Sequence, residues 1–418
     1  MGKDEKQLYH HLSRKGCSRS PLDNPLKPAY NWFIHQIIRR LAMRYNDFHG
    51  EKVSALGFGC MRLPVMDNDQ SKIDMPKTEE KLLYAYEHGV NYYDTAYPYH
   101  NGFSEVALGE ILERNNIRDK VNIATKLFTL EIGKPGFDPE KMLSTQLARL
   151  KTDHEDYYLI HGVHGDQWEW LKKDYNIIEF LAEKRRRGVI RHMGFSFHDS
   201  YEAFVKLIDD YDWEFAQIQY NYLDNEIQAG DRGLAYAGSK GIPLNIMEPI
   251  KGGNLIFPDY PAIDEIRAKH GITESNAELA LRYVFDKENL HVVLSGMNAM
   301  EQVKENIAIT ERCGVGCLTE SEKACIDDIR SFLETVDTIP CTACRYCTAG
   351  CPQQIQIPRA VSCYNTAVKF GNKEAQMRNY SRSCANLADC VECGQCREAC
   401  PQHLDIPELL KKVRAYFD

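Results

Sequence analysis

Two cysteine runs near the carboxyl end are the feature that most constrains how this chain can fold. Both runs have the spacing C-x₂-C-x₂-C-x₃-C followed by proline, which is typical of iron–sulfur proteins. Closely spaced thiolates can wrap three irons of one cubane, and the cysteine before the proline is free to ligate the other cluster. The runs therefore predict two [4Fe–4S] clusters. The predicted ligands are Cys341, Cys344, Cys347 and Cys400 for the first cluster, and Cys351, Cys390, Cys393 and Cys396 for the second.

Zinc sites and disulfides are the alternatives for so many thiols. Zinc takes four ligands arranged in pairs, so a third regularly spaced cysteine and a Cys-Pro step would be surplus to it. Disulfides are typical of short secreted domains, whereas this chain has 418 residues and does not start with a basic stretch and an apolar core. We therefore expect most of its 15 cysteines to be metal ligands, redox-active groups or buried core residues.

The cysteine-rich segment resembles the two-cluster ferredoxins of bacterial type over roughly its whole length. Thirty-eight residues separate Cys351 from Cys390, which is long for a compact βαβ ferredoxin. Residues 358–370 within this spacer have the pattern of a helix. We therefore expect residues 336–418 to form a small, mostly helical ferredoxin-like domain.

A repeated strand–helix unit occupies the chain from about Ser54 to Thr310. Short apolar, β-branched or aromatic runs alternate with helical patterns. Such alternation implies parallel strands, and eight units in this length predict a (β/α)₈ barrel. An open doubly wound sheet is the alternative, but GFGCMR after the first run lacks the spacing G-x-G-x-x-G. The expected strands are residues 54–63, 90–96, 121–126, 156–162, 190–197, 214–221, 242–249 and 291–296.

Residues 1–42 differ from the rest in charge. They contain eight Lys or Arg residues against three Asp or Glu residues. One hypothesis is a flexible or docking arm; the other, which we favour, is an artefactual start upstream of Met43, where the coherent pattern begins. The expected domains are thus a basic extension at 1–42, a barrel at 43–335 and a cluster domain at 336–418.

Charge and hydropathy exclude some classes of partner. The formal net charge is −9, whereas nucleic-acid-binding domains usually carry a basic surface. No apolar run approaches the ~20 residues that a membrane helix needs. We therefore expect a cytoplasmic protein that binds neither nucleic acid nor membrane.

Four polar residues follow successive expected strands, where barrel enzymes place their chemistry. They are Asp94, Tyr99, Lys126 and His161. A phenol normally keeps its proton up to pH of about 10, and a neighbouring ammonium favours the phenolate. In this arrangement the carboxylate would hold the ammonium and the imidazole would donate to a substrate oxygen. Such a group suits the conversion of a carbonyl into an alkoxide.

Residues 43–310 resemble an aldo/keto reductase. The segments DTAYPY (94–99), ATK (124–126) and DYYLIHG (156–162) match that family's catalytic motifs. The resemblance implies that Tyr99 is the general acid, that Lys126 tunes its pKa and pairs with Asp94, and that His161 orients the carbonyl.

The resemblance also implies a nicotinamide pocket, with departures from the family pattern. Ser196 and Gln217 match the family, but Phe197 stands where an asparagine is usual. Gly296 and Gln302 replace the basic residues that grip the 2′-phosphate of NADPH, so a preference for NADPH is not expected. The candidate residues for NAD(P)H are Ser196, Gln217, Glu248, Ile250, Gly296 and Asn306.

Barrel and cluster segment together resemble a group of bacterial and archaeal oxidoreductases. A nicotinamide hydride carries two electrons, whereas a [4Fe–4S] cluster passes one at a time. In one hypothesis, a ferredoxin or other electron-transfer partner feeds the reduction of a small-molecule carbonyl or activated double bond through the clusters. In a second, NAD(P)H drives the reduction and the clusters are structural or sense redox state. In a third, the protein transfers electrons or senses redox state, and its barrel binds a ligand without turnover.

Overall fold

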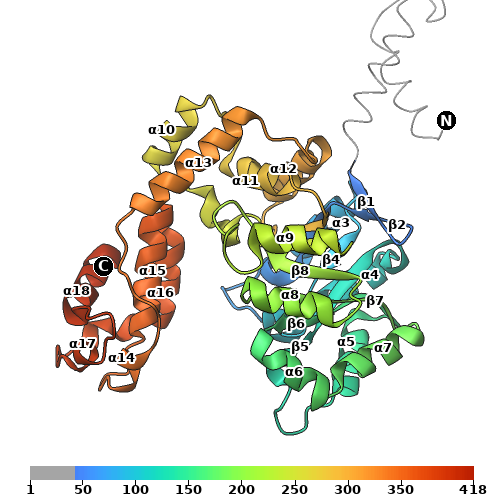
Figure 1. The fold of residues 1–418 in the computed structure, drawn as a ribbon, viewed down its shortest axis with the longest axis horizontal. Coiled ribbons are helices and arrows are strands. Elements are labelled where there is room, and N and C mark those ends of the chain that lie inside the picture. Colours follow the sequence, from blue (N-terminus) through green and yellow to red (C-terminus); the bar gives the residue numbers. More distant parts are fainter. Residues whose placement is uncertain (1–42) are drawn as a thin grey trace, which may run out of the picture. The chain divides into compact units, whose positions relative to one another are not determined.

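The computed structural model describes residues 43–418 (Figure 1). The expected basic extension and the expected artefactual start concern residues 1–42, which lie outside the described residues. Within residues 43–418, no helix has the length and apolarity that a membrane crossing requires.

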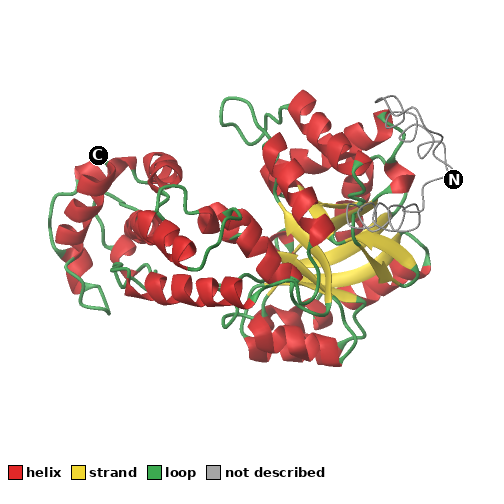
Figure 2. Cartoon of the chain, turned by 90° about the horizontal axis from the view of Figure 1, so that it is seen from above, coloured by secondary structure: helices red, strands yellow, loops and turns green. Residues whose placement is uncertain are grey.

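Eight parallel strands close into a barrel, and helices surround it (Figure 2). Each strand pairs with its neighbours in chain order, and the last strand pairs with the first. The predicted (β/α)₈ fold is therefore confirmed, and the open sheet is excluded. The barrel strands are β3 (Leu56–Gly59), β4 (Tyr92–Asp94), β5 (Asn122–Phe128), β6 (Glu155–Val163), β7 (Ile190–Phe197), β8 (Phe215–Gln219), β9 (Leu244–Met247) and β10 (Leu290–Ser295).

Helices connect the strands, and their starts follow from local sequence. The Asp138 side chain accepts a hydrogen bond from the backbone N–H of Glu140 at the start of α5, and Ser200 caps α8 in the same way through Ala203. Pro139 stands at the first position of α5, where its missing N–H costs nothing. The helices of this part are α3 (Met75–Glu87), α4 (Phe103–Arg114), α5 (Pro139–Leu150), α6 (Gly165–Lys173), α7 (Ile177–Arg186), α8 (Tyr201–Asp210), α9 (Gly230–Ser239), α10 (Pro261–Lys269), α11 (Asn276–Phe285) and α12 (Met300–Arg312).

A β-hairpin that the sequence did not predict packs on the amino-terminal end of the barrel. It consists of β1 (Tyr45–Phe48) and β2 (Glu51–Ser54), which pair antiparallel. Phe48 is buried, and its ring lies 4.5 Å from the His291 ring and 5.4 Å from the Tyr157 ring. The sequence signal was weak because both strands are short and mostly polar, and only Phe48 and Val53 bring apolar side chains to the buried face.

The carboxyl-terminal segment is helical, as expected. Its elements form two similar halves, in which a short helix precedes a longer one that starts at an Ile-Pro step. Proline suits the first turn of each longer helix. The helices are α13 (Glu320–Thr335), α14 (Tyr346–Ala349), α15 (Ile357–Phe370), α16 (Lys373–Ser383), α17 (Gln395–Glu398) and α18 (Ile406–Phe417).

The loop between β9 and α10 contacts the cluster segment. The Phe257 ring lies 6.2 Å from the Phe370 ring at the end of α15. The Tyr260 hydroxyl donates to the Val368 carbonyl at 3.4 Å. This loop begins at Glu248, so the segment that carries two candidate NAD(P)H residues also contacts the helix that follows the first cysteine run.

Close packing between α4 and α5 predicts that Gly109→Ala destabilises the barrel. An added Cβ would lie 2.4 Å from the Arg149 carbonyl oxygen and 2.7 Å from the Leu150 backbone. The helices must separate to admit it, so we expect a loss of about 1–3 kcal/mol in the free energy of unfolding. Denaturant unfolding followed by circular dichroism measures this loss.

Gly238→Ala in α9 is the matched control, since an added Cβ there meets nothing nearer than 3.4 Å. Alanine has the higher helix propensity, so this variant should be neutral or more stable by up to about 1 kcal/mol. Equal effects of the two substitutions would contradict the packing argument.

Candidate active site and cluster cavities

The four candidate catalytic residues lie at the carboxyl ends of three adjacent strands. Asp94 ends β4, Lys126 lies in β5 and His161 lies in β6. The register pairs Lys126 with Leu159 and Phe128 with His161, so His161 extends one step further toward the carboxyl end. Tyr99 begins the short 3₁₀ turn Tyr99–Gly102 beyond β4. The structure thus brings all four residues together.

A buried ion pair joins Lys126 to Asp94. The Lys126 ammonium donates to both Asp94 carboxylate oxygens at 2.8 Å and to the Thr95 carbonyl at 2.6 Å. Burial lowers the pKa of Lys126, but the Asp94 charge and the interactions with Tyr99 together outweigh burial and raise that pKa overall. Lys126 therefore stays positively charged beside Tyr99.

The Tyr99 side chain is partly exposed and faces Lys126 and His161. Its ring centroid lies 5.1 Å from the Lys126 ammonium and 6.1 Å from the His161 ring. Desolvation raises the pKa of Tyr99, and the attraction of Lys126, which lowers that pKa, does not cancel it. The expectation of a lowered pKa is therefore wrong for this structure, because desolvation outweighs the attraction of Lys126 and the negative charge of Asp94 adds a smaller effect in the same raising direction. Tyr99 is held in its protonated form.

His161 is a neutral imidazole. Burial lowers its pKa to about 3, and the neighbouring Lys126 charge and His198 act in the same direction. Its Nδ1 is buried and has no hydrogen-bond partner among the described residues. A neutral ring keeps one N–H, which can donate a hydrogen bond without placing a second positive charge beside Lys126.

Ser196 and Gln217 lie in the neighbouring strands β7 and β8, whereas Asn306 lies in α12. Two of these candidate nicotinamide residues already have protein partners. The Ser196 hydroxyl accepts the backbone N–H of Gly162 at 2.8 Å. The Asn306 amide donates to Ser295 at 2.9 Å. By contrast, the side-chain oxygen of Gln217 is buried without a partner among the described residues. An amide donor of a ligand would satisfy it, which fits the carboxamide of a nicotinamide.

Glu248 and Gly296, two further candidate residues, are exposed to solvent. Glu248 is exposed and has a left-handed φ of 55°. Its carbonyl accepts the Asn221 amide at 3.1 Å, which holds the start of the loop that continues through Ile250. Gly296 is exposed, and an added Cβ would lie 3.5 Å from the Arg62 side chain.

Arg62 was missed in the sequence. It belongs to the turn after β3, and its guanidinium donates to the Gly252 carbonyl at 2.8 Å. Arg62 thus lies near the ends of three strands, β3, β9 and β10. It is the only positively charged residue of the turn after β3. Its position directly after the first strand was a usable signal, because strand ends in barrels carry functional side chains.

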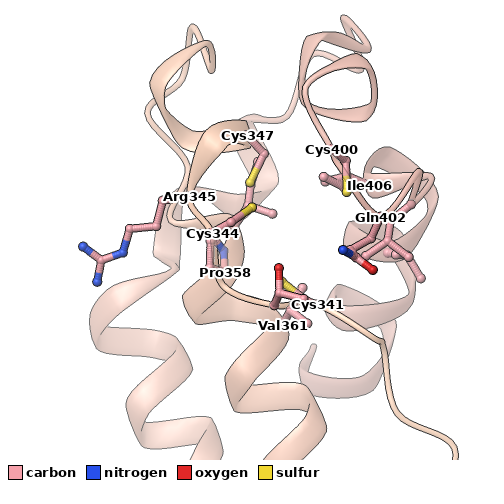
Figure 3. A pocket seen from close by; sticks show the side chains of 13 residues that line it. Cys341, Cys344, Arg345, Cys347, Pro358, Val361, Cys400, Gln402 and Ile406 are labelled. Carbon is pink, nitrogen blue, oxygen red and sulfur yellow. The ribbon is translucent and has the colours of Figure 1, made fainter. Parts of the chain in front are cut away.

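Two cavities in the carboxyl-terminal segment are lined by the cysteine runs. In the first, the side chains of Cys341, Cys344, Cys347 and Cys400 point toward a common space, while Arg345 points away (Figure 3). Apolar side chains such as Val361 and Ile406 line the rest. The second cavity is lined by Cys351, Cys390, Cys393 and Cys396.

The donor sets fit iron–sulfur clusters. Each cavity presents four thiols, three from one run and one from the other. This is the crossed arrangement that the spacing predicts. The assignment of each thiol to a cluster stays a prediction.

Comparison with known proteins identifies both parts of the chain. Residues 55–327 match the profile of the Aldo/keto reductase family. The chain belongs to the aldo/keto reductase family. Residues 340–404 match the profile of a 4Fe-4S dicluster domain. The protein is therefore an oxidoreductase enzyme with an iron–sulfur domain. This finding disfavours the third hypothesis, in which the barrel binds a ligand but catalyses no reaction.

Known relatives of this aldo/keto reductase match its barrel part. L-galactose dehydrogenase of Arabidopsis thaliana is 26% identical over 313 residues, which cover 69% of this chain and 93% of that protein. The NADH-specific methylglyoxal reductase of Escherichia coli is 24% identical over 61% of this chain and 89% of its own length. An aldo-keto reductase from Bacillus halodurans, solved in its holo form, has a TM-score of 0.56 and 26% identity, over 68% of this chain and 96% of that one.

The buried ion pair predicts that Asp94→Asn strongly destabilises this aldo/keto reductase. The substitution leaves the Lys126 ammonium buried without a counter-charge, so we expect a loss of about 3–5 kcal/mol in the free energy of unfolding. Adding Lys126→Met should recover part of the loss, because it removes the unpaired charge. Denaturant unfolding of both single variants and the double variant measures the coupling.

Asp67→Asn is the control for this cycle. Asp67 also pairs with a lysine, Lys72, at 3.4 Å, but both side chains are largely exposed. Exposed pairs contribute about 0–1 kcal/mol. A loss at Asp94 as small as that at Asp67 would show that the ion pair does not hold the strand ends together.

Proposed function

We propose that this enzyme reduces the carbonyl group of a small molecule to an alcohol, with Tyr99 as the proton donor. The observation that carries the proposal is the contact of three groups: protonated Tyr99, the Lys126–Asp94 ion pair and neutral His161. When bound, a nicotinamide cofactor supplies a hydride. Gln217, with its unpartnered side-chain oxygen, and Ser196 would hold the carboxamide of the nicotinamide.

The chain's own residues provide the remaining steps. The neutral His161 ring donates a hydrogen bond to the carbonyl oxygen and orients it toward Tyr99. The Tyr99 hydroxyl then gives its proton to the developing alkoxide. The Lys126 ammonium stabilises the phenolate that remains, because it lies beside the ring and is held there by Asp94.

NADH is the proposed hydride source. Gly296 and Gln302 offer no positive charge for a 2′-phosphate, and Gln302 instead accepts the backbone N–H groups of Asn298 and Ala299 at the start of α12. The NADH-specific name of the methylglyoxal reductase relative supports the same choice. We further propose that each cysteine cavity holds one [4Fe–4S] cluster.

Tyr99→Phe should lower the kcat/KM for carbonyl reduction by about 10²–10⁴-fold, the usual contribution of a general acid. Binding of NADH should be unchanged, since the hydroxyl is assigned only to proton transfer. The assay follows NADH oxidation anaerobically with a panel of aldehydes and ketones, beginning with methylglyoxal.

Tyr97→Phe is the matched control, because Tyr97 lies two residues away and its ring packs on Arg149. Its kcat/KM should remain close to that of the unaltered enzyme. Full activity of Tyr99→Phe would refute the proposed proton donor.

The pKa directions predict a flat pH profile. His161 has a pKa lowered to about 3 and Tyr99 has a raised pKa. As the pH falls from about 8 to 5.5, an ordinary histidine with a pKa of about 6.5 would gain a proton, whereas His161 should stay neutral. The kcat/KM should therefore show no ionisation in this range. A break near pH 6.5 that disappears in His161→Asn would contradict the neutral imidazole.

Cys396→Ser tests whether carbonyl reduction needs the clusters. We expect the variant to lose one cluster, measured as iron content and EPR signal, and to retain NADH-driven reduction, because Cys396 lies outside the barrel site. Cys363→Ser is the control, since Cys363 is buried in the same segment but outside both cavities. A fall in NADH-driven turnover of more than about tenfold for Cys396→Ser alone would mean that electrons pass through the clusters.

A further inference from the structure

A group of potential metal ligands lies at the opposite end of the barrel from Tyr99. His49 stands in the turn of the β1–β2 hairpin, His192 lies near the start of β7, and Glu214 directly precedes β8. The ligand atoms of these three residues all lie within 4.8 Å of one another. Tyr99 and its partners follow the carboxyl ends of the strands, so the group is separate from the proposed active site.

The distances place both imidazoles around one carboxylate oxygen. His192 Nδ1 lies 3.0 Å and His49 Nε2 lies 3.8 Å from Glu214 Oε1. The planes of the two imidazole rings are within 10° of parallel. Tetrahedral ligand atoms about 2.0–2.2 Å from a metal ion are themselves about 3.3–3.6 Å apart. The two distances to Glu214 lie on either side of that range, and all three ligand atoms lie within 4.8 Å of one another.

We propose that His49, His192 and Glu214 bind one divalent transition-metal ion of the zinc class. Two imidazoles and one carboxylate suit such an ion, and water would complete its coordination. Glu214 is already oriented, because its Oε2 accepts the backbone N–H of Met193 at 3.0 Å. His49 and Glu214 line an open depression of about 700 Å³, through which a hydrated ion can reach the ligands.

Arg185 competes for the same carboxylate. Its guanidinium lies 2.9 Å from Glu214 Oε1. Arg185 is exposed at the end of α7, so it can leave the carboxylate when an ion arrives. Metal binding at His192 Nδ1 requires the tautomer that carries its proton on Nε2. In the metal-free protein the arginine supplies positive charge beside the carboxylate.

The ion would fasten the hairpin to the barrel. His49 is the only one of the three ligands that belongs to the hairpin, and the other two belong to the barrel. The adjacent Phe48 ring packs among the buried rings at the amino-terminal end of the barrel, 4.8 Å from the His192 ring. The inferred site is thus structural, at the end of the barrel where side chains typically serve stability.

Isothermal titration of the full-length, cluster-containing protein with Zn²⁺ tests the site. We expect one ion per chain in the low micromolar range or tighter. His49→Asn should weaken this binding at least about tenfold, as loss of a ligand does. Asparagine keeps the turn intact, because His49 has a left-handed φ of 51° that asparagine tolerates. His88→Asn, an exposed histidine outside the group, should bind as the unaltered protein does.

Arg185→Gln provides a test in the opposite direction. Removing the competing guanidinium should tighten Zn²⁺ binding several-fold, whereas Arg186→Gln, the next residue of α7, should leave it unchanged. Non-specific binding to surface histidines would not respond to Arg185.

X-ray absorption at the zinc edge distinguishes this site from the cysteine cavities. Nitrogen and oxygen neighbours at about 2.0 Å support the proposal, whereas sulfur neighbours at about 2.3 Å would place the ion on cysteines and overturn it. Absence of saturable binding, or equal affinity in His49→Asn, would also overturn it.

Discussion

The buried ammonium of Lys126 is the constraint on which the barrel site depends. A charge at this depth is tolerated only when an opposite charge and further hydrogen-bond acceptors surround it. Asp94 and the Thr95 carbonyl provide them at 2.6–2.8 Å. Both belong to the end of β4, so the ion pair joins two neighbouring strand ends. The turn that carries Tyr99 starts directly after this point.

Burial, together with this ion pair, explains why the phenol and the imidazole keep their neutral forms. Desolvation outweighs the attraction of Lys126, which Asp94 partly offsets, so the pKa of Tyr99 rises. Burial also lowers the pKa of His161, and the neighbouring Lys126 charge and His198 act in the same direction. A protonated phenol and a neutral imidazole are the forms that can both donate hydrogen bonds to a substrate oxygen. These are the forms that the proposed carbonyl reduction requires.

The loop between β9 and α10 is the place where the two halves of the enzyme meet. It begins with Glu248 and Ile250, and it reaches α15 through Phe257 and Tyr260. The aromatic contacts give this connection an apolar core. The same loop therefore carries two candidate cofactor residues and the contacts with the cluster segment. The opposite end of the barrel is closed by the β1–β2 hairpin and its histidine group.

The sequence by itself determined the fold class and the residue types of the site. Eight strand–helix units require parallel pairing, and two regularly spaced cysteine runs before proline predicted the iron–sulfur domain, because both signals depend on local spacing along the chain. The expected strand at 190–197 agrees with β7. Strand ends also pointed to Tyr99, Lys126 and His161, since parallel strands bring their carboxyl ends together.

Only the tertiary structure decided what depends on contacts between distant residues. The β1–β2 hairpin is held by Phe48 against rings from other strands, so its polar sequence did not indicate it. The direction of the Tyr99 pKa depends on how burial balances against the Asp94-neutralised charge of Lys126. The contact between Arg62 and Gly252 joins residues 190 positions apart in the chain. Burial and charge act through space, whereas sequence patterns report only neighbours along the chain.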